Sequence, residues 1–310
     1  MNSSTLSTLS TLFGDRMQEN APLSGYTSAR IGGPADAMVF IHSEAELVQA
    51  AEKLWELAIP FVLVGGGSNM LVSDRGVRGV VLVNRARLVK FDSQAEPPTV
   101  RAESGATLND IAQRAARLGL ADLEWAASIP GSLGGAVYGN AGAFGGEMAG
   151  NLVSVELLFK HGRETWPVEK MDYGYRTSAL KRKSSGALIL AATLKMSRGN
   201  REAIQAKMFK NAERRRCTQP PGASMGSMFK NPPNDKAGRL LEAAGLKGTR
   251  IGSAEISTQH ANFFINTDRT RAEDMKVLID LAQKTVFEKF GVKLETEIEL
   301  IGDWLEKSKK

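Results

Sequence analysis

The distribution of apolar and polar residues in the first part of the chain predicts short strands separated by a helix. Residues 37–41 and 60–64 are continuous apolar runs, which indicate two buried strands. A helix over 43–57 is predicted to begin at Ser43, because Glu46 follows it at the spacing of a capping box. The second strand runs directly into a glycine turn, and ligands in α/β sheets bind at the carboxyl ends of strands.

The remaining pattern predicts a mixed sheet, followed by a second region of helices and strands. A change of composition at 198–200 predicts a domain boundary there. The expected strands are 80–83, 100–103, 151–160, 187–195, 261–265 and 294–300, and the expected helices are 107–118, 201–216, 237–244 and 271–290.

Length and composition are those of a globular enzyme. With 310 residues, the chain exceeds what one ordinary core supports, which predicts two or three domains. No apolar run reaches the length of about 20 residues that a membrane span needs, and the Ser-Thr-Leu repeats at the N-terminus do not resemble a secretory signal. The single cysteine, Cys217, excludes an internal disulfide, and three scattered histidines give no metal-ligand spacing. We therefore expect a cytoplasmic protein without a metal.

The net charge of +6 favours anionic partners. The basic clusters at 181–183 and 214–216 are short, and the aromatic content of 6% does not build a base-stacking platform beside them. Phosphorylated small molecules explain the charge better than nucleic acid does.

Two glycine-rich segments are candidates for binding such a molecule. Residues 129–146 include seven glycines and no charged side chain, but also Val137, Tyr138 and Phe144, which favour burial over a flexible linker. Bare backbone amides suit a diphosphate. Residues 65–69, Gly-Gly-Gly-Ser-Asn, match neither the dinucleotide fingerprint nor a P-loop, so they form either a tight turn or a pyrophosphate site.

Several further motifs, taken together, carry a resemblance. The segment 224–232 gathers hydroxyl, ammonium and amide groups beside glycine and proline, although alone it would suit a turn. The motifs are YTSARIGGP at 26–34, LVGGGSNML at 63–71, IPGSLGG at 129–135, NAG at 140–142, YRTS at 175–178, GSMFKNP at 226–232 and LETEI at 294–298. In this order they resemble the UDP-N-acetylenolpyruvoylglucosamine reductase family, in its shorter second type.

The resemblance implies an α+β fold. It comprises a two-part FAD-binding domain of the vanillyl-alcohol-oxidase (PCMH) type and a smaller α/β substrate-binding domain. The expected parts are a flexible N-terminal arm over 1–22, FAD-binding subdomains over 23–84 and 85–198, and the substrate-binding domain over 199–310.

The implied reaction is the NADPH-dependent, FAD-mediated reduction of UDP-N-acetylglucosamine enolpyruvate to UDP-N-acetylmuramate in peptidoglycan biosynthesis. Hydride would go to the enolpyruvyl methylene carbon, and the adjacent carbon would then be protonated. The implied cofactor is FAD, NADPH is the co-substrate, and we expect a monomer with no nucleic-acid or membrane partner. Another FAD oxidase of the same fold, or a nucleotide-binding module without chemistry, remains as an alternative.

Three residues correspond to the family's catalytic set. Arg176 would hold the substrate carboxylate and stabilise an enolate-like intermediate, a role suited to a planar, always-charged fork. Ser227 would deliver the proton, with Ser224 as its competitor nearby. Glu297 would lie by the same carboxylate if it is protonated, and Glu295 is expected on the same strand face.

The remaining implied residues bind the two ligands. Ser128 stands where the family frequently has glycine and Ala29 where it frequently has an aromatic residue, and both departures are expected to be tolerated. His260 and Cys217 are expected to be structural. Tyr175, Lys230 and Asn231 would contact the substrate. The FAD-binding residues would be Arg30, Gly65, Gly66, Gly67, Ser68, Asn69, Ile129, Pro130, Gly131, Gly134, Gly135, Asn140 and Gly142.

Overall fold

The computed structural model describes residues 1–183 and 186–304, which form two compact units. The first unit comprises Met1–Met38, Gly67–Val81 and Arg216–Lys310, and the second comprises Val39–Gly66 and Leu82–Arg215. Each unit therefore combines segments that are distant along the chain.

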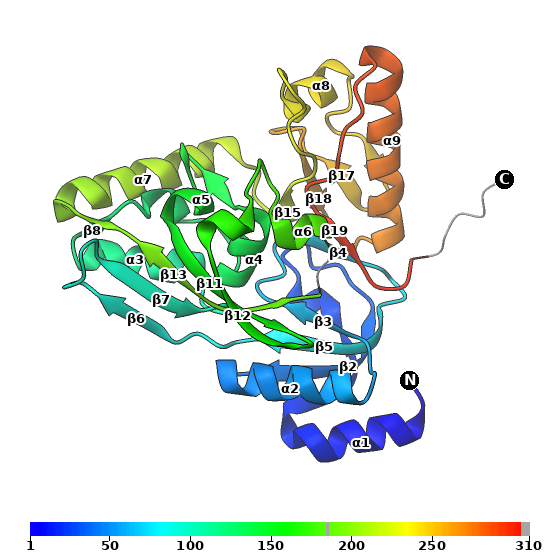
Figure 1. Ribbon diagram of the computed structural model, residues 1–310. Helices are drawn as coiled ribbons and strands as arrows, with labels where there is room; N and C mark the ends of the chain where they lie inside the picture. The colour runs from blue at the N-terminus through cyan, green and yellow to red at the C-terminus, as the bar shows by residue number, and fades with distance from the viewer. Residues whose placement is uncertain (184–185, 305–310) are drawn as a thin grey trace. The chain divides into compact units, whose positions relative to one another are not determined.

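A five-stranded antiparallel sheet forms the centre of the second unit (Figure 1). Its order is β12-β11-β13-β7-β6, and successive residues of the edge strand β12 alternate between half-buried and exposed. The strands are β6 (Val89–Asp92), β7 (Thr99–Glu103), β11 (Leu152–Phe159), β12 (Gly162–Pro167) and β13 (Leu188–Lys195). Two short pairs, β8 (Leu120–Ala121) with β14 (Ser197–Arg198) and β9 (Gly142–Ala143) with β10 (Gly146–Glu147), extend this unit.

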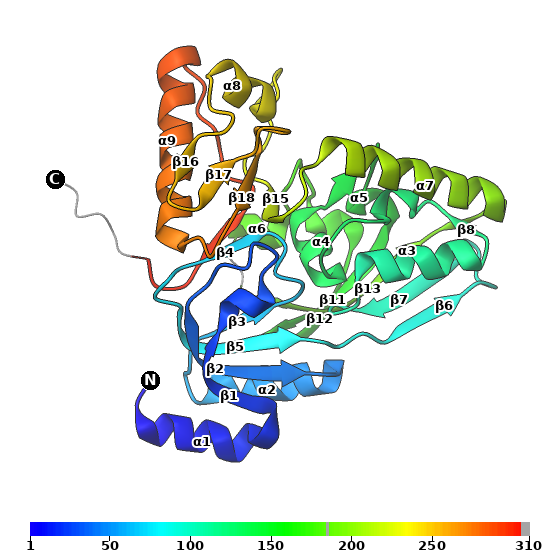
Figure 2. The same cartoon turned by 180° about the vertical axis from the view of Figure 1, so that it is seen from behind.

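Helices cover one face of this sheet, as Figures 1 and 2 show for α3, α4 and α7. The second unit as a whole contains the helices α2 (Glu44–Glu56), α3 (Leu108–Arg117), α4 (Leu133–Gly139), α5 (Met148–Asn151), α6 (Ala179–Lys183) and α7 (Arg201–Thr218), of which α2 lies on the other side of the sheet from α3, α4 and α7. The apolar stripe of α3 lies in the core of the unit, with Ile111 and Ala115 fully buried. Burial of this stripe stabilises the helix against the sheet.

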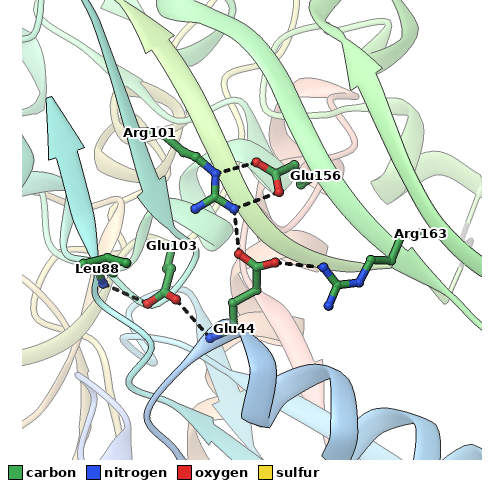
Figure 3. Close-up of polar contacts among 6 residues, drawn as sticks. All are labelled: Glu44, Leu88, Arg101, Glu103, Glu156 and Arg163. Atoms are coloured by element: carbon green, nitrogen blue, oxygen red, sulfur yellow. Dashed lines mark hydrogen bonds and ion pairs between the residues drawn. The ribbon is translucent and has the colours of Figure 1, made fainter. Parts of the chain in front are cut away.

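Charged side chains attach the start of α2 to the sheet (Figure 3). Arg101 binds Glu156 at 2.7 Å and Glu44 at 2.6 Å, while Arg163 binds the other oxygen of Glu44 at 3.1 Å. Glu103 accepts from the backbone N–H of Glu44 at 3.0 Å. The two carboxylates hold the pKa of Arg101 above its usual range, against the effect of partial burial. Glu103 on β7 thereby satisfies one backbone N–H of the α2 terminus that the helix itself leaves without a partner.

The C-terminal part of the first unit has its own sheet and core. Strands run in the order β15 (Ala223–Ser227), β18 (Phe263–Asn266), β17 (Ala254–Ile256) and β16 (Arg250–Ile251). The sheet packs with α8 (Ala237–Ala243) and α9 (Ala272–Phe290) (Figure 1). Leu278 and Ala282 of α9 are fully buried.

Asp74 caps α9 from a distant segment. Its carboxylate accepts from the backbone N–H groups of Ala272 and Glu273 at 2.8 and 3.0 Å. These are N–H groups that a helix cannot satisfy internally, and a negative charge is favourable at this end of the helix.

The remaining strands complete the fold. One sheet has the order β1-β2-β5-β3, and β4 pairs in parallel with β19. The strands are β1 (Met17–Pro22), β2 (Pro34–Ile41), β3 (Phe61–Val64), β4 (Met70–Val72), β5 (Val77–Asn84) and β19 (Glu299–Ile301). Short 3-10 turns lie at Gly14–Arg16, Leu23–Tyr26, Glu124–Ala126 and Val168–Met171.

The expected α+β class is confirmed, but the N-terminal segment differs from the flexible arm expected there. Helix α1 (Ser3–Phe13) begins where the Asn2 side chain accepts from the Thr5 N–H at 2.8 Å. Leu9 is fully buried and Phe13 is 6% exposed. The Ser-Thr-Leu repeat spaces leucines three apart, close enough to the helical period to bury one side.

The last expected strand is also different, because it divides between two partners. Thr296 pairs with Phe229, the chain bends at Glu297, and Glu299–Ile301 then pairs with β4. Alternation of apolar and polar residues over 294–300 thus reflects two short pairings and not one regular strand. Glu295 and Glu297 consequently do not share the face of one strand.

Candidate active site

The two glycine segments that the sequence singles out lie against each other in the second unit. A Cβ on Gly66 would lie 2.8 Å from the Cα of Gly131, and one on Gly65 would lie 2.2 Å from Ser132 Oγ. Gly131 has a φ of 120°, which disfavours a side chain in any case. The two backbones can approach this closely only because both segments lack side chains here.

Helix α4 begins at this contact, and two backbone N–H groups of its first turn already have hydrogen-bond partners within the protein. Its first-turn N–H groups at Leu133 and Gly134 donate to Ala106 O and Ser104 O, both at 2.8 Å. The Gly135 N–H has only a long bond of 3.4 Å, to Ser132 Oγ. The backbone N–H groups of the glycine loop are therefore better placed to bind an anionic group than those at the start of α4.

The outer side of this turn has room for a ligand. Gly135 is exposed, and a Cβ built on it would meet only Ser132 Oγ, at 3.7 Å. Ile129 packs against the core of the unit and Pro130 is exposed, while Ser128 has a φ of 68°, the left-handed region that favours glycine. A glycine cradle with an open side fits the diphosphate of a dinucleotide cofactor.

Asn140 and Gly142 lie beyond the other end of α4. Asn140 is 2% exposed, and its Nδ2 donates to Gly174 O at 3.1 Å and Glu147 Oε2 at 3.2 Å. A Cβ on Gly142 would lie 2.8 Å from that of Glu147. The Asn140 side chain already has hydrogen-bond partners within the protein, and Gly142 packs closely against Glu147. A direct role of these two residues in binding FAD remains a prediction.

Arg176 lies at the tip of a tight hairpin. Gly174 and Thr177 exchange two backbone hydrogen bonds of 3.2 Å, which leaves Tyr175 and Arg176 as the turn. Arg176 has a φ of 55°, and its guanidinium lies 5.8 Å from the ring of Tyr175. Tyr175 is 53% exposed and Arg176 is half-buried, so both side chains are near the surface of the second unit.

In the first unit, the turn of Arg30 lies beside Gly67. A Cβ on Gly67 would lie 2.0 Å from Tyr26 O, and the Ser28 N–H donates to Gly67 O at 3.0 Å. Arg30 is exposed, with a φ of 55°. The structure thus brings two motifs of the expected flavin site together, although they are distant in sequence.

Asn69 joins the same loop to the region of Glu297. Its Nδ2 donates to Glu297 O at 3.0 Å, and its carbonyl accepts from the Glu299 N–H at 3.0 Å. An expected cofactor residue therefore orients the backbone of an expected catalytic residue. Ser68, next in the loop, is half-buried.

Ser227 lies at the end of β15, beside Glu297. A bulge between Ser224 and Ser227 separates the two serines, so Ser224 pairs with Ile265 and Ser227 with Phe263. The Glu297 N–H donates to the carbonyl of Met228, the residue after Ser227, at 2.8 Å. Both side chains are half-buried.

The alternative carboxylate, Glu295, has a different environment. It is 72% exposed and lies 3.4 Å from the Lys230 ammonium, and its carbonyl accepts from the Lys230 N–H. Asn231 accepts from the Ala237 N–H at 3.1 Å and so caps α8. The structure therefore favours Glu297 over Glu295 as the neighbour of Ser227.

Asn262 supports the segment that follows Ser227, a role that the sequence analysis did not identify. It is 4% exposed and forms side-chain hydrogen bonds to both backbone groups of Phe229. His260 accepts from the Asn262 N–H at 3.2 Å, which supports the structural role expected for it. The only sequence signal for this role was an asparagine two residues after His260, and that signal does not show that Asn262 bonds to Phe229.

Comparisons with known proteins show the family to which the chain belongs. The family profile for the FAD binding domain matches residues 35–166, and that for the C-terminal domain of UDP-N-acetylenolpyruvoylglucosamine reductase matches residues 218–301. The UDP-N-acetylenolpyruvoylglucosamine reductase of Chloroflexus aggregans is 41% identical over 289 residues, 92% of this chain and 97% of its own. The chain belongs to the UDP-N-acetylenolpyruvoylglucosamine reductase family. The Bacillus subtilis member is 41% identical over 285 residues, 91% of this chain and 93% of its own.

A solved structure of this family gives the same result. The reductase from Thermus caldophilus has a TM-score of 0.78 and 35% identity, covering 92% of this chain and 99% of that one. Membership of the reductase family and the match to the FAD binding domain identify FAD as the cofactor. Through residue 183 and from 186 to 304, none of the helices combines the length and apolar character needed to cross a bilayer.

Proposed function

We propose that this chain is a UDP-N-acetylmuramate dehydrogenase, which reduces UDP-N-acetylglucosamine enolpyruvate with NADPH. The observation that carries the proposal is the backbone hydrogen bond from the Glu297 N–H to the carbonyl of Met228, the residue after Ser227. This bond supports the proposal because it joins the backbone of Glu297 to the backbone next to Ser227, and both residues belong to the expected catalytic set. Identity of 41% over 92% of the chain supports the same substrate class.

Arg176 would bind the substrate carboxylate. FAD, when held by the glycine cradle, would supply the hydride-transfer chemistry between NADPH and the enolpyruvyl methylene carbon. Charge then develops on the carbon conjugated to the carboxylate, and fixed positive groups stabilise such charge. The planar guanidinium of Arg176 suits a carboxylate because it can donate two parallel hydrogen bonds.

Ser227 would donate the proton to that carbon. A serine hydroxyl is a weak acid, but an enolate-like carbon is a strong base. Glu297 beside it would be protonated or share a proton with the substrate carboxylate, because two bare carboxylates repel each other.

The binding roles follow the two regions described above. Gly65, Gly66, Gly131, Gly134 and Gly135 would hold the FAD diphosphate by close approach of their backbone. The other expected FAD contributors are Arg30, Gly67, Ser68, Asn69, Ile129, Pro130, Asn140 and Gly142, with Tyr175, Lys230 and Asn231 at the substrate. We further propose a cytoplasmic monomer that uses neither a metal nor a nucleic-acid partner.

A two-stage stopped-flow experiment tests the proposal. The yellow holoenzyme should lose its flavin absorbance with NADPH and regain it anaerobically on addition of UDP-N-acetylglucosamine enolpyruvate. NADH in place of NADPH measures the coenzyme preference. Recovery with oxygen but not with the sugar nucleotide would instead identify an oxidase of the same fold, and a colourless protein that binds no FAD would contradict both.

A further inference from the structure

Two hydroxyl groups attach the Arg176 hairpin to the C-terminal end of helix α4. The Tyr173 hydroxyl donates to Val137 O at 2.8 Å, and Ser178 Oγ donates to Tyr138 O at 2.7 Å. Ser178 is fully buried, and burial raises the pKa of the Tyr173 phenol above its usual range. These two residues flank the hairpin on its two sides, so both of its strands are held.

A third bond fixes the base of the same hairpin. Asn140, the residue that ends α4 in a left-handed conformation, donates from Nδ2 to Gly174 O at 3.1 Å. Gly174 is also one of the two residues that close the turn through backbone bonds to Thr177. Three side-chain hydrogen bonds therefore anchor the turn: two from the hairpin to the successive α4 carbonyls of Val137 and Tyr138, and one from Asn140 to the Gly174 carbonyl.

The two hydroxyl groups bond to carbonyl groups of the last turn of α4, which would otherwise be left to water. The last carbonyls of a helix have no partner within it, so donors from another segment can attach there at little cost. The other end of α4 begins at the contact between Gly66 and Gly131. One short helix thus connects the glycine cradle to the hairpin of Arg176.

The conformation of Arg176 requires such anchors. A φ of 55° is unfavourable for a residue with a side chain, and such conformations persist when the surroundings hold them. Without the hydroxyl groups, the turn could relax and move the guanidinium.

We propose that Tyr173 and Ser178 are positioning residues for Arg176, and that α4 transmits the position of the glycine cradle to the guanidinium. This inference rests on the proposed role of Arg176 at the substrate carboxylate. It assigns a function to two hydroxyl groups that contact neither ligand in that proposal.

Removal of the hydroxyl groups tests the inference in the FAD-loaded enzyme. Tyr173→Phe and Ser178→Ala should each slow flavin reoxidation by UDP-N-acetylglucosamine enolpyruvate about fivefold, and the double variant about 25-fold, if each net hydrogen bond is lost from the substrate-binding geometry. Bound FAD and the rate of flavin reduction by NADPH should not change. Hydrogen exchange at the Gly174 and Thr177 amides should become faster in the double variant, with or without FAD.

Asn151→Ala is a matched control for general loss of stability. Asn151 accepts from Trp125 Nε1 at 2.9 Å and donates to Lys195 O at 3.1 Å in the same unit. This variant should melt at a lower temperature, yet below that temperature it should carry out both half-reactions at wild-type rates.

The outcomes separate this inference from the proposed function. Wild-type reoxidation rates in the double variant, unchanged hydrogen exchange, or equal slowing of both half-reactions would each overturn the positioning role. Failure of the wild-type enzyme itself to react with the sugar nucleotide would instead remove the proposed function, and the positioning role with it.

Discussion

Asn262 holds the backbone of Phe229 from both sides. Its Oδ1 accepts from the Phe229 N–H at 2.9 Å, and its Nδ2 donates to Phe229 O at 2.8 Å. The Asn262 carbonyl also accepts from the Met228 N–H at 2.7 Å. Because Ser227 directly precedes these residues, its orientation depends on an asparagine far along the chain.

Asn262→Ala should therefore destabilise the protein strongly. It would leave two buried backbone groups of Phe229 without partners, which lowers the free energy of unfolding by about 2 to 4 kcal/mol. Urea denaturation of the wild type and the variant measures the difference. Asn211→Ala, at a half-buried position of α7, removes one hydrogen bond, from Asn211 Nδ2 to Glu124 O at 3.1 Å, and should cost much less. Equal losses in the two variants would contradict the role of Asn262.

His260 should contribute to stability only above acidic pH. Burial lowers the pKa of His260 below its usual range, and Nδ1 must stay unprotonated to accept from the Asn262 N–H. Near pH 6.5, about the ordinary value, the unfolded chain then binds more protons than the folded one. The contribution is complete above that pH and is lost as the pH falls below it.

NMR titration of the imidazole protons measures this directly. The His260 resonance should titrate below about pH 6.5, and His260→Gln should reduce the fall in urea midpoint between neutral and mildly acidic pH. Titration at or above the ordinary value, or an unchanged pH dependence in the variant, would contradict the prediction.

The two serines of β15 should have different kinetic effects. Ser227→Ala should slow flavin reoxidation by the sugar nucleotide about 100-fold or more, the usual contribution of a general acid, and leave flavin reduction by NADPH intact. Ser224→Ala should leave both rates near wild type, because the bulge at Gly226 separates its position from that of Ser227. Stopped-flow measurement of both half-reactions decides, and the reverse result would transfer the proton-donor role to Ser224.

Two glycine variants should separate folding of the cradle from cofactor binding. Gly66→Ala forces a Cβ to within 2.8 Å of Gly131 Cα, so the apoprotein should lose stability. Gly135→Ala meets only Ser132 Oγ at 3.7 Å, so the apoprotein should keep or gain stability, by up to about 1 kcal/mol in a helix. Its methyl group nevertheless lies on the side assigned to FAD and should weaken FAD binding.

Thermal unfolding of the apoproteins and FAD titration by fluorescence measure the two effects. Wild-type FAD affinity in Gly135→Ala would exclude that side of the turn as the binding face. Unchanged stability in Gly66→Ala would show that the two loops can separate without cost.

Local signals in the sequence predicted most of the regular elements. Ser43 accepts from the Glu46 N–H at 3.2 Å, as its spacing suggests, and α2, α3, α7 and α9 lie close to their expected positions. Caps and periodicity act within one or two turns, so they are legible in one segment of sequence. Helix α4 was missed within its glycine-rich loop because glycine is a poor helix former, and tertiary bonds to Ser104 O and Ala106 O compensate for it.

By itself, the sequence determined the order of the motifs, and through them the family, the cofactor and the chemical types of the site residues. Only the tertiary structure decided which residues meet. Gly66 lies against Gly131, Asn69 bonds to Glu297, and Glu295 lies beside Lys230 and not beside Ser227. These contacts join segments far apart along the chain, and their geometry depends on packing and hydrogen-bond satisfaction across both segments. No single stretch of residue types contains that information.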